Sequence, residues 1–314
     1  MELHKLYRPL TAAPFAGNHG YREFPPCQAL APYIRCFWGM GQWPYRNWQP
    51  QMGQSHQSPQ ATCVIPDTCA DLLFEIDFTG SRLCSRFCGI SDGMFQTSCG
   101  QEAGEHYLFG IRFYAWSVVL FSEDSLRSTC NCLTDAGQHF GRIKREMEGI
   151  LFEAESPEAL VEAAEKILLK NLRVRQENAA VWEAVGMMIL KKGNLRTGGL
   201  AGELHRSSRQ MERLFGEYIG ISPKKLASLI RYQYLWRDIL ESFHLNMKNN
   251  REKAGAAYRA ERISGSAVLD WVEQYGYTDQ AHLLRDFKKY HSMTISQART
   301  YALQFLPDVA FLQE

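Results

Sequence analysis

The sequence contains no run of eighteen apolar residues, so no segment is predicted to cross a membrane as a helix, and no membrane partner is expected. It also lacks a basic start followed by an apolar stretch, and without that export signal we expect the protein in the cytoplasm. A Gly-x-Ser-x-Gly elbow, a P-loop and a dinucleotide-binding glycine motif are all missing. We therefore expect neither catalysis nor a cofactor. The length of 314 residues suffices for two or three packed domains.

Histidine is scarce in the first part of the chain. Before residue 136 it occurs at His4, His19, His56 and His106, and no two of these form a His-x-His pair. Metal centres built from imidazoles need clustered ligands, so we expect no metal site.

Cysteine is confined to the first half of the chain, where all nine cysteines lie between Cys27 and Cys132. An odd number in a chain without an export signal argues against a disulfide framework. Cys84-x3-Cys88 and Cys130-x-Cys132 are spaced for a metal or thiol-sensing pair, but no histidine completes a zinc-type set. Most of the cysteines are therefore interpreted as buried free thiols.

The net charge of +1 conceals an uneven distribution of charged residues. Between Lys191 and Phe305 there are 19 Lys and Arg against 11 Asp and Glu, a balance of +8. The rest of the chain has 16 against 23, a balance of −7. A basic third in a nearly neutral chain is typical of a nucleic-acid-binding module joined to a domain with a different task.

The pattern of apolar residues divides the chain into three parts and predicts an α+β fold. The parts are a β-rich domain at residues 1–135, a helical connector at residues 136–192 and an all-α domain at residues 193–306.

Strand-length apolar runs support the β-rich domain. They lie at residues 61–65, 72–76 and 107–113, and Gly, Pro and Asp separate them. Residues 48–60, which are rich in Gly, Gln, Pro and Ser, are expected to form a long loop.

Helix signals mark the connector. Ser156 is a typical N-cap, Pro157 suits the first helical position, and Glu158 is an acid in the first turn. A second apolar helix is predicted from Ala180 to Leu190, ended by Gly193. Such a connector can form a homodimer interface, and packing against its own domain is the equally favoured alternative.

Two stretches of the all-α domain, seventy-two positions apart, have the same pattern. Residues 207–218 and 279–290 both contain Arg-x-Phe-x-x-Tyr, beginning at Arg213 and Arg285, with an apolar residue two positions earlier. Each stretch follows a short helix-like segment and a tight turn. A tandem pair of helix-turn-helix units has few uses other than binding duplex DNA.

The first repeat is predicted to begin with a Ser-x-x-Gln capping box at Ser207 and Gln210. Helical spacing then places Met211, Leu214, Phe215, Tyr218 and Ile219 on one buried stripe. The outer face presents Ser208, Arg209, Glu212 and Arg213, in the turns from which a recognition helix reads base edges.

In the second repeat Asp279 is the predicted cap, and Leu283, Phe287 and Tyr290 form the buried stripe. The outer face presents Gln280, Ala281, His282, Leu284 and Arg285. Arg and Gln match guanine and adenine edges, and Leu284 suits a thymine methyl group. Pairing of the arginines with neighbouring acids or with phosphates is the alternative for each of them.

These repeats resemble the AraC family of bacterial transcription regulators over about residues 195–302. The resemblance is carried by the two stretches above, by Gly220-Ile221-Ser222-Pro223, and by Gly276-Tyr277-Thr278. It implies two helix-turn-helix subdomains joined by a linker helix, each inserting a recognition helix into successive major grooves. The contacts that it implies are Ser208, Arg209, Glu212, Arg213, Gln280, Ala281, His282 and Arg285.

The sequence departs from the family pattern at three places. His205 stands where the family has a turn glycine, and Ser292 and Ile295 replace the Gly and Pro that usually follow the second recognition helix. The stretch between Arg231 and Trp271 is longer than the family's linker. Because residues 246–253 include Asn-Asn, a poor helix interior, we expect the excess to be a surface excursion rather than a longer helix.

The first domain resembles, less specifically, a sensory domain often found upstream of such units. The supporting segments are Leu30-Ala31-Pro32-Tyr33-Ile34, Pro66-Asp67-x-Cys69-x-Asp71-Leu72 and Gly110-Ile111-Arg112-Phe113. The resemblance implies a β-barrel-like domain of cupin shape that binds an unknown small-molecule effector. Candidate effector contacts are Trp38, Trp43, Cys69 and Trp116, although aromatics in a β-domain more often belong to its core.

The leading hypothesis is a transcription regulator in which an effector-binding domain controls the DNA-binding unit. Its implied partners are double-stranded DNA, the small-molecule effector, a second copy in a homodimer, and RNA polymerase. The alternative is a sensor whose metal or thiol chemistry, with Cys69 as the candidate, controls the same unit.

Overall fold

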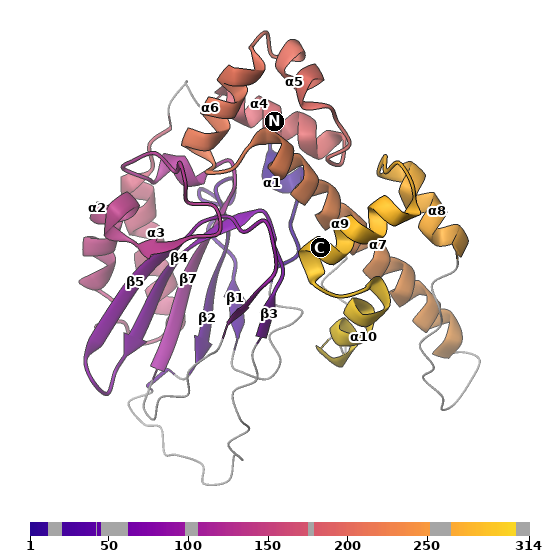
Figure 1. The fold of residues 1–314 in the computed structure, drawn as a ribbon. Coiled ribbons are helices and arrows are strands. Elements are labelled where there is room, and N and C mark those ends of the chain that lie inside the picture. The colour runs from indigo at the N-terminus through magenta and orange to yellow at the C-terminus, as the bar shows by residue number, and fades with distance from the viewer. Residues whose placement is uncertain are drawn as a thin grey trace.

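The computed structural model describes residues 1–11, 21–41, 43–44, 62–97, 106–174, 179–251 and 265–305. An antiparallel sheet forms the N-terminal part, and helices follow it along the chain (Figure 1). This order confirms the predicted α+β class. In the ranges just given, no helix combines the length and the apolar character needed to cross a membrane.

The described strands are β1 (Arg22–Phe24), β2 (Ile34–Gly41), β3 (Thr62–Val64), β4 (Cys69–Asp77), β5 (Arg82–Cys88), β6 (Phe95–Thr97), β7 (His106–Tyr114) and β8 (Leu133–Asp135). The described α-helices are α1 (Leu3–Leu6), α2 (Gly137–Glu148), α3 (Pro157–Asn171), α4 (Ala179–Leu190), α5 (Thr197–Glu203), α6 (Ser208–Tyr218), α7 (Pro223–Arg251), α8 (Gly265–Gln274), α9 (Gln280–His291) and α10 (Ile295–Phe305). A short 3-10 helix, η2 (Val118–Leu120), follows β7.

Six strands form one antiparallel sheet in the order β1-β2-β7-β4-β5-β8, and β3 pairs separately with β6. The three strand-length runs predicted from the sequence correspond to β3, β4 and β7. Because side chains alternate along a strand, Phe109 and Ile111 of β7 face one side and Arg112 faces the other. The apolar side packs against α2, where the rings of Phe87 and Phe140 lie 4.8 Å apart.

The connector contains the two predicted helices. The side chain of Ser156 accepts a hydrogen bond from the Ala159 amide, and Pro157 opens α3 as expected. Helix α4 packs against α1, α6 and α7, and Gly193, with φ +72°, follows its end. The buried apolar residues of α4 therefore pack against helices of the two neighbouring parts of this chain, and a homodimer interface at the connector stays a prediction.

Helix α7 links the two helical pairs, and here the expectation of a surface excursion is corrected. The helix continues to Arg251, through the Asn-Asn pair at residues 249–250 (Figure 1). Asparagine costs a helix less than about 1 kcal/mol relative to alanine, and extending a helix that has already formed is cheap. Residues 252–264, the rest of the long stretch, lie outside the described residues.

The first helical pair is joined directly to the sheet domain. The Leu126 amide donates to the Glu217 carbonyl at 2.9 Å, and Arg127 pairs with the Glu217 carboxylate at 3.2 Å. Gly220, with φ +89°, lies so close that a Cβ atom there would meet Thr129 Oγ1 at 2.5 Å. The corner between α6 and α7 is therefore seated on the segment that precedes β8.

Candidate nucleic-acid interface

Both candidate recognition helices begin with the side-chain caps that the sequence predicts. In α6, Ser207 Oγ accepts from the Gln210 amide and Gln210 Oε1 accepts from the Ser207 amide, which completes the capping box. In α9, Asp279 Oδ1 accepts from the His282 amide at 2.7 Å. Each helix start is thus fixed by groups within one turn of it.

The turns before these helices repeat the same hydrogen bonds. In the first pair, the His205 amide donates to the Gly202 carbonyl, and the Arg206 amide donates to the Ala201 carbonyl. In the second pair, the Gly276 amide donates to the Glu273 carbonyl, and the Tyr277 amide donates to the Val272 carbonyl. These equivalent turn residues are seventy-one positions apart, whereas the caps are seventy-two apart. The second turn is therefore one residue longer.

The three departures from the family pattern have local outcomes. His205 has φ +50°, close to the +64° of Gly276, so the turn keeps its left-handed backbone although a histidine occupies it. Ser292 has φ +56° at the C-cap of α9, and Ile295 begins α10. Both helix endings thus have a left-handed residue that is not glycine.

Helix α6 presents the predicted outer face to solvent. Met211, Phe215 and Ile219 are 2%, 0% and 2% exposed and form the inward stripe, with Leu214 and Tyr218 half-buried beside it. The opposite side carries the four predicted contacts, all of them exposed: Ser208, Arg209, Glu212 and Arg213. Their separation from the core leaves them available to an external partner.

Helix α9 is divided in the same way. Leu283, Phe287 and Tyr290 are at most 1% exposed, which confirms the predicted stripe. Gln280, Ala281 and Arg285 are exposed, and Leu284 is 40% exposed. His282 is half-buried, because its ring packs edge-on against Tyr277 with the centroids 5.2 Å apart.

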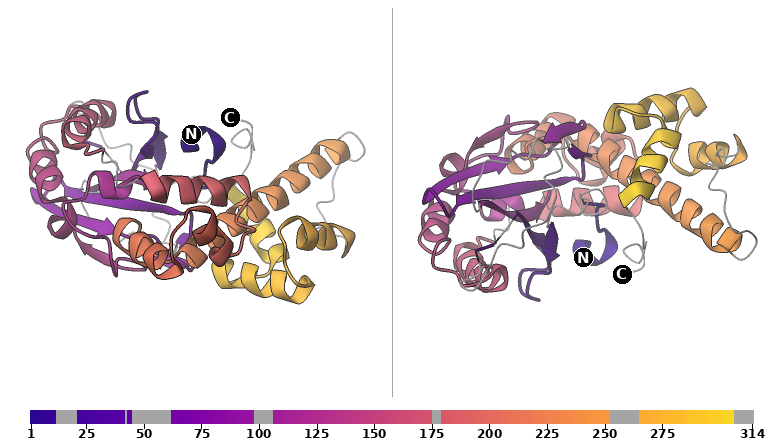
Figure 2. Two further views of the ribbon diagram at one scale, coloured as in Figure 1. Left: turned by 90° about the horizontal axis from the view of Figure 1, so that it is seen from above. Right: turned by 90° about the horizontal axis from the view of Figure 1, so that it is seen from below.

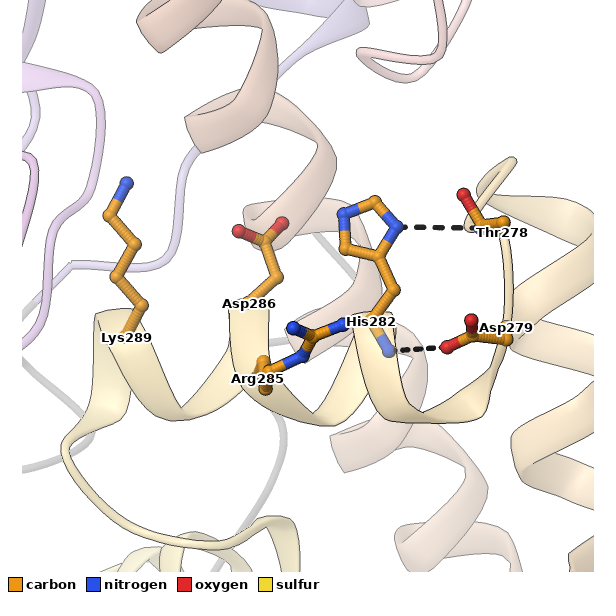
Figure 3. Close-up of a pocket in the computed structure, with 6 residues that line it drawn as sticks. All are labelled: Thr278, Asp279, His282, Arg285, Asp286 and Lys289. Atoms are coloured by element: carbon orange, nitrogen blue, oxygen red, sulfur yellow. Dashed lines mark hydrogen bonds between the residues drawn. The ribbon is translucent and has the colours of Figure 1, made fainter.

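An open depression of about 540 Å³ lies along one flank of α9 (Figure 3). It is lined by Thr278, Asp279, His282, Arg285, Asp286 and Lys289. Arg285 Nε donates to the Ala281 carbonyl of its own helix at 3.2 Å, which restrains the guanidinium along the helix. Thr278 and Lys289 are not among the contacts predicted from the sequence; the Lys288-Lys289 pair of the second repeat is the signal that indicates the lysine.

A polar network on the inner side of α9 was also missed. Arg231 of α7 pairs with Asp286 at 3.2 Å, and the Tyr277 hydroxyl donates to the same carboxylate at 3.2 Å. The guanidinium of Arg231 lies 4.2 Å from the centroid of the Tyr277 ring. This network fixes α9 to the linker helix, so Asp286 has a structural partner although it also borders the depression.

Aromatic packing completes the contact between α7 and the second unit. Trp236 and Tyr232 of α7 contact His291, and the ring of His291 stacks on Phe287 with the centroids 4.5 Å apart. His291 Nδ1 and the Tyr232 hydroxyl share a hydrogen bond of 2.6 Å. Burial lowers the pKa of His291 to about 3, so its ring is neutral near pH 7.

The two candidate recognition helices lie on a common side of the molecule. In both views of Figure 2, the orange α6 and the yellow α8 and α9 lie along the same long side. They are joined by α7, which packs against both α6 and α9. The structure thus places the two helices on one side of the molecule, while the role of each predicted contact residue stays a prediction.

The four candidate effector contacts are buried in the sheet domain. Trp38, Trp43, Cys69 and Trp116 are 8%, 5%, 4% and 2% exposed. The indole of Trp116 donates to the Pro32 carbonyl, and the ring of Trp43 packs edge-on against Tyr107. Contact of these four residues with an effector stays a prediction.

The indole of Trp38 belongs to a buried charge cluster that joins residues 66–72 to residues 110–113. Arg112 on β7 donates to Asp71 on β4 at 2.9 Å and lies 3.6 Å from Asp67. Trp38 Nε1 donates to the same Asp71 oxygen at 2.9 Å. Burial raises the pKa of Asp67 to about 6, an effect that the Arg112 guanidinium opposes.

Burial disfavours the thiolate form of several cysteines in the described ranges. Burial raises the pKa of Cys36 and of Cys69 well above the ordinary value, and it raises the pKa of Cys88 to about 12. The described cysteines are free thiols, and Cys84 is exposed. Across the described ranges, no group of three or more His, Cys, Asp and Glu side chains is close enough to hold a metal ion.

Comparisons with known proteins give limited matches. Residues 22–131 match a family described as a domain of unknown function (DUF6597), which covers a little over a third of the chain. The curated proteins gave no match. A crystal structure of ToxT from Vibrio cholerae O395 is similar at 11% identity and a TM-score of 0.36, covering 92% of this chain and 99% of that one. A second structure of ToxT from Vibrio cholerae, at 1.65 Å, has 12% identity and a TM-score of 0.37 over 78% and 96% of the two chains. These values are too low to assign a function.

Proposed function

We propose that this protein is a transcription regulator that binds double-stranded DNA with sequence preference through α6 and α9. The observation that carries the proposal is the repeated helix-turn-helix geometry, with matching turn hydrogen bonds and matching caps. A helix that buries one stripe and exposes polar and cationic residues in its first turns is suited to the major groove. The excess of basic residues in this part of the chain favours the same partner.

Individual contacts follow from the exposed faces. Arg213 and Arg285 suit guanine, Gln280 suits adenine, and Glu212 suits the amino group of cytosine. Ser208, Arg209 and His282 can contact either bases or the sugar-phosphate backbone, and Ala281 permits close approach or meets a thymine methyl group.

Selection from random duplexes tests this function. We expect the full-length protein to enrich a motif with two parts, one for each recognition helix. If the selected pool shows no sequence preference, or if no duplex is retained at moderate salt, the proposal fails.

Regulation is the second part of the proposal. We infer that the sheet domain binds a small-molecule effector, that the regulator works as a homodimer, and that it acts on transcription through contact with RNA polymerase. Effector binding is preferred over thiol chemistry because burial raises the pKa of Cys69 and thereby disfavours its thiolate. Native mass spectrometry of protein purified without denaturation would detect a retained ligand and the oligomeric state together.

A further inference from the structure

The turn that enters β4 contacts the linker helix between the two DNA-binding units. Gln233 of α7 is 1% exposed and donates through Nε2 to the Pro66 carbonyl at 2.7 Å. Its Oε1 accepts from the Leu10 amide, also at 2.7 Å. One buried side chain of α7 therefore holds both the turn and the N-terminal segment of the sheet domain.

This turn has a strained residue that several contacts hold in place. Thr68 has φ +64°, in the left-handed region that a β-branched residue rarely adopts. The Tyr7 hydroxyl and Thr68 Oγ1 share a hydrogen bond of 3.0 Å, and Asp67 Oδ1 accepts from the Cys69 amide at 2.9 Å. A strained turn of this kind changes conformation when its restraints are removed.

The charge cluster of the sheet supplies one of those restraints. Asp67 lies between the Gln233 contact at Pro66 and the Arg112 guanidinium, which is 3.6 Å from its carboxylate. Asp71 competes for the same guanidinium at 2.9 Å. A change in the charge or position of this cluster would therefore move the neighbouring Pro66 carbonyl, which accepts the hydrogen bond from Gln233.

The same part of α7 positions the second recognition helix. Arg231 pairs with Asp286, and Tyr232 and Trp236 pack around His291, within one turn of Gln233 on either side. The first recognition helix is instead seated on the sheet domain through Leu126 and Glu217. A shift of α7 at Gln233 would thus move α9 while α6 stays in place.

We propose that Gln233 and the turn at residues 65–69 form a coupling device, through which rearrangement of the Arg112–Asp67–Asp71 cluster changes the separation of the two recognition helices. The device rests on the proposed DNA-binding function, because its output is the spacing of two half-sites. A conformational change in the sheet domain would then reach the DNA-binding unit through the hydrogen-bonded side chain of Gln233.

The experiment compares Gln233→Leu and Asp67→Asn with the wild type and with Ile239→Val. Ile239 is a buried residue of the same helix, 1% exposed, and this substitution perturbs packing without removing a hydrogen bond. Binding is measured by fluorescence anisotropy on duplexes in which the selected half-sites are moved apart or together by one and two base pairs.

We expect Gln233→Leu and Asp67→Asn to lose at least tenfold affinity for the spacing that the wild type selects, or to prefer another spacing, while Ile239→Val keeps the wild-type profile. Equal losses at every spacing, or wild-type profiles for all variants, would overturn the coupling device.

Hydrogen exchange separates failure of this device from failure of the proposed function, because it needs no DNA. In both test variants, peptides covering residues 226–240 and 283–291 should take up deuterium faster than in Ile239→Val at equal global stability. If they do not, the coupling is absent whether or not the protein binds DNA. If the wild type binds no duplex but the exchange changes as expected, the proposed function alone is wrong.

Discussion

Arg231 on α7 and Asp286 on α9 form an ion pair of 3.2 Å in which each side chain is 15% exposed. The pair lies behind the outer face of α9, and the Tyr277 hydroxyl shares its carboxylate. The position of α9 therefore depends on a partly buried electrostatic contact as well as on apolar packing.

Removing one partner of this pair should destabilise the protein. Arg231→Met leaves the Asp286 carboxylate with only the Tyr277 hydroxyl, and we expect a loss of about 2 kcal/mol in the free energy of unfolding. Urea denaturation measures it. The double variant Arg231→Met with Asp286→Leu should recover at least half of the loss, because no charge is then left unpaired. A double variant less stable than the single one would show that the contact works in another way.

The two arginines of the repeated motif should each contribute to DNA affinity. Arg213→Ala and Arg285→Ala remove exposed guanidinium groups without touching the core, so we expect each to weaken binding to the selected duplex by roughly 1–3 kcal/mol and to relax preference at one base pair. Arg145→Ala, on α2, is the matched control and should bind as the wild type does. Unchanged binding by both test variants would place the DNA contact elsewhere.

Protonation of His291 should destabilise the fold in acid. Burial lowers its pKa from 6.5 to about 3, so the unfolded chain binds this proton more readily than the folded one. The stabilising contribution is complete above about pH 6.5 and falls as the pH is lowered towards 3, at up to about 1.4 kcal/mol per pH unit.

The variant His291→Phe checks this assignment. Its stability, followed by denaturation between pH 4 and 6, should depend less steeply on pH than that of the wild type. Tyr232→Phe removes the hydrogen bond but keeps the imidazole, and its pH dependence should remain steep. Equal slopes in all three proteins would assign the acid sensitivity to other groups.

Glycines in the two helix-turn-helix units should respond in opposite ways to alanine. Gly199 lies in α5, and a Cβ atom there would meet nothing within 4 Å, so Gly199→Ala should stabilise the protein by about 0.5–1 kcal/mol. Gly276 has φ +64°, and a Cβ atom would lie 2.3 Å from the Asn194 side chain. Gly276→Ala should therefore lower the thermal midpoint, whereas Gly199→Ala should raise it. Destabilisation by Gly199→Ala would mean that α5 needs its glycines for another reason.

The sequence predicted the features that depend on neighbouring residues. The caps at Ser207 and Asp279, the buried stripes of α6 and α9 and the strand at residues 107–113 all follow from patterns within a few turns or one strand. Short-range hydrogen bonds and side-chain periodicity determine such features, so they can be read without knowing the rest of the fold.

Long-range contacts could not be predicted in this way. Gln233 and Pro66 are 167 positions apart, and Arg112 and Asp71 are 41 apart, so no local pattern pairs them. The left-handed His205 is a related case, since its turn is held by two backbone hydrogen bonds that do not depend on the side chain. The prediction of a surface excursion is wrong as far as Arg251, because a helix that has already formed extends through weak helix formers at little cost.

The close approach at Gly220 has a consequence for how this architecture can change. Because a Cβ atom would meet both Thr129 Oγ1 and the Leu126 carbonyl, a single methyl group there would act as a wedge between the α6–α7 corner and the sheet domain. Substitution of Gly220 by alanine would therefore loosen the α6–α7 corner from the sheet domain without altering any residue on the exposed faces of α6 and α9. Glycine at this position keeps the α6–α7 corner seated against the segment that precedes β8.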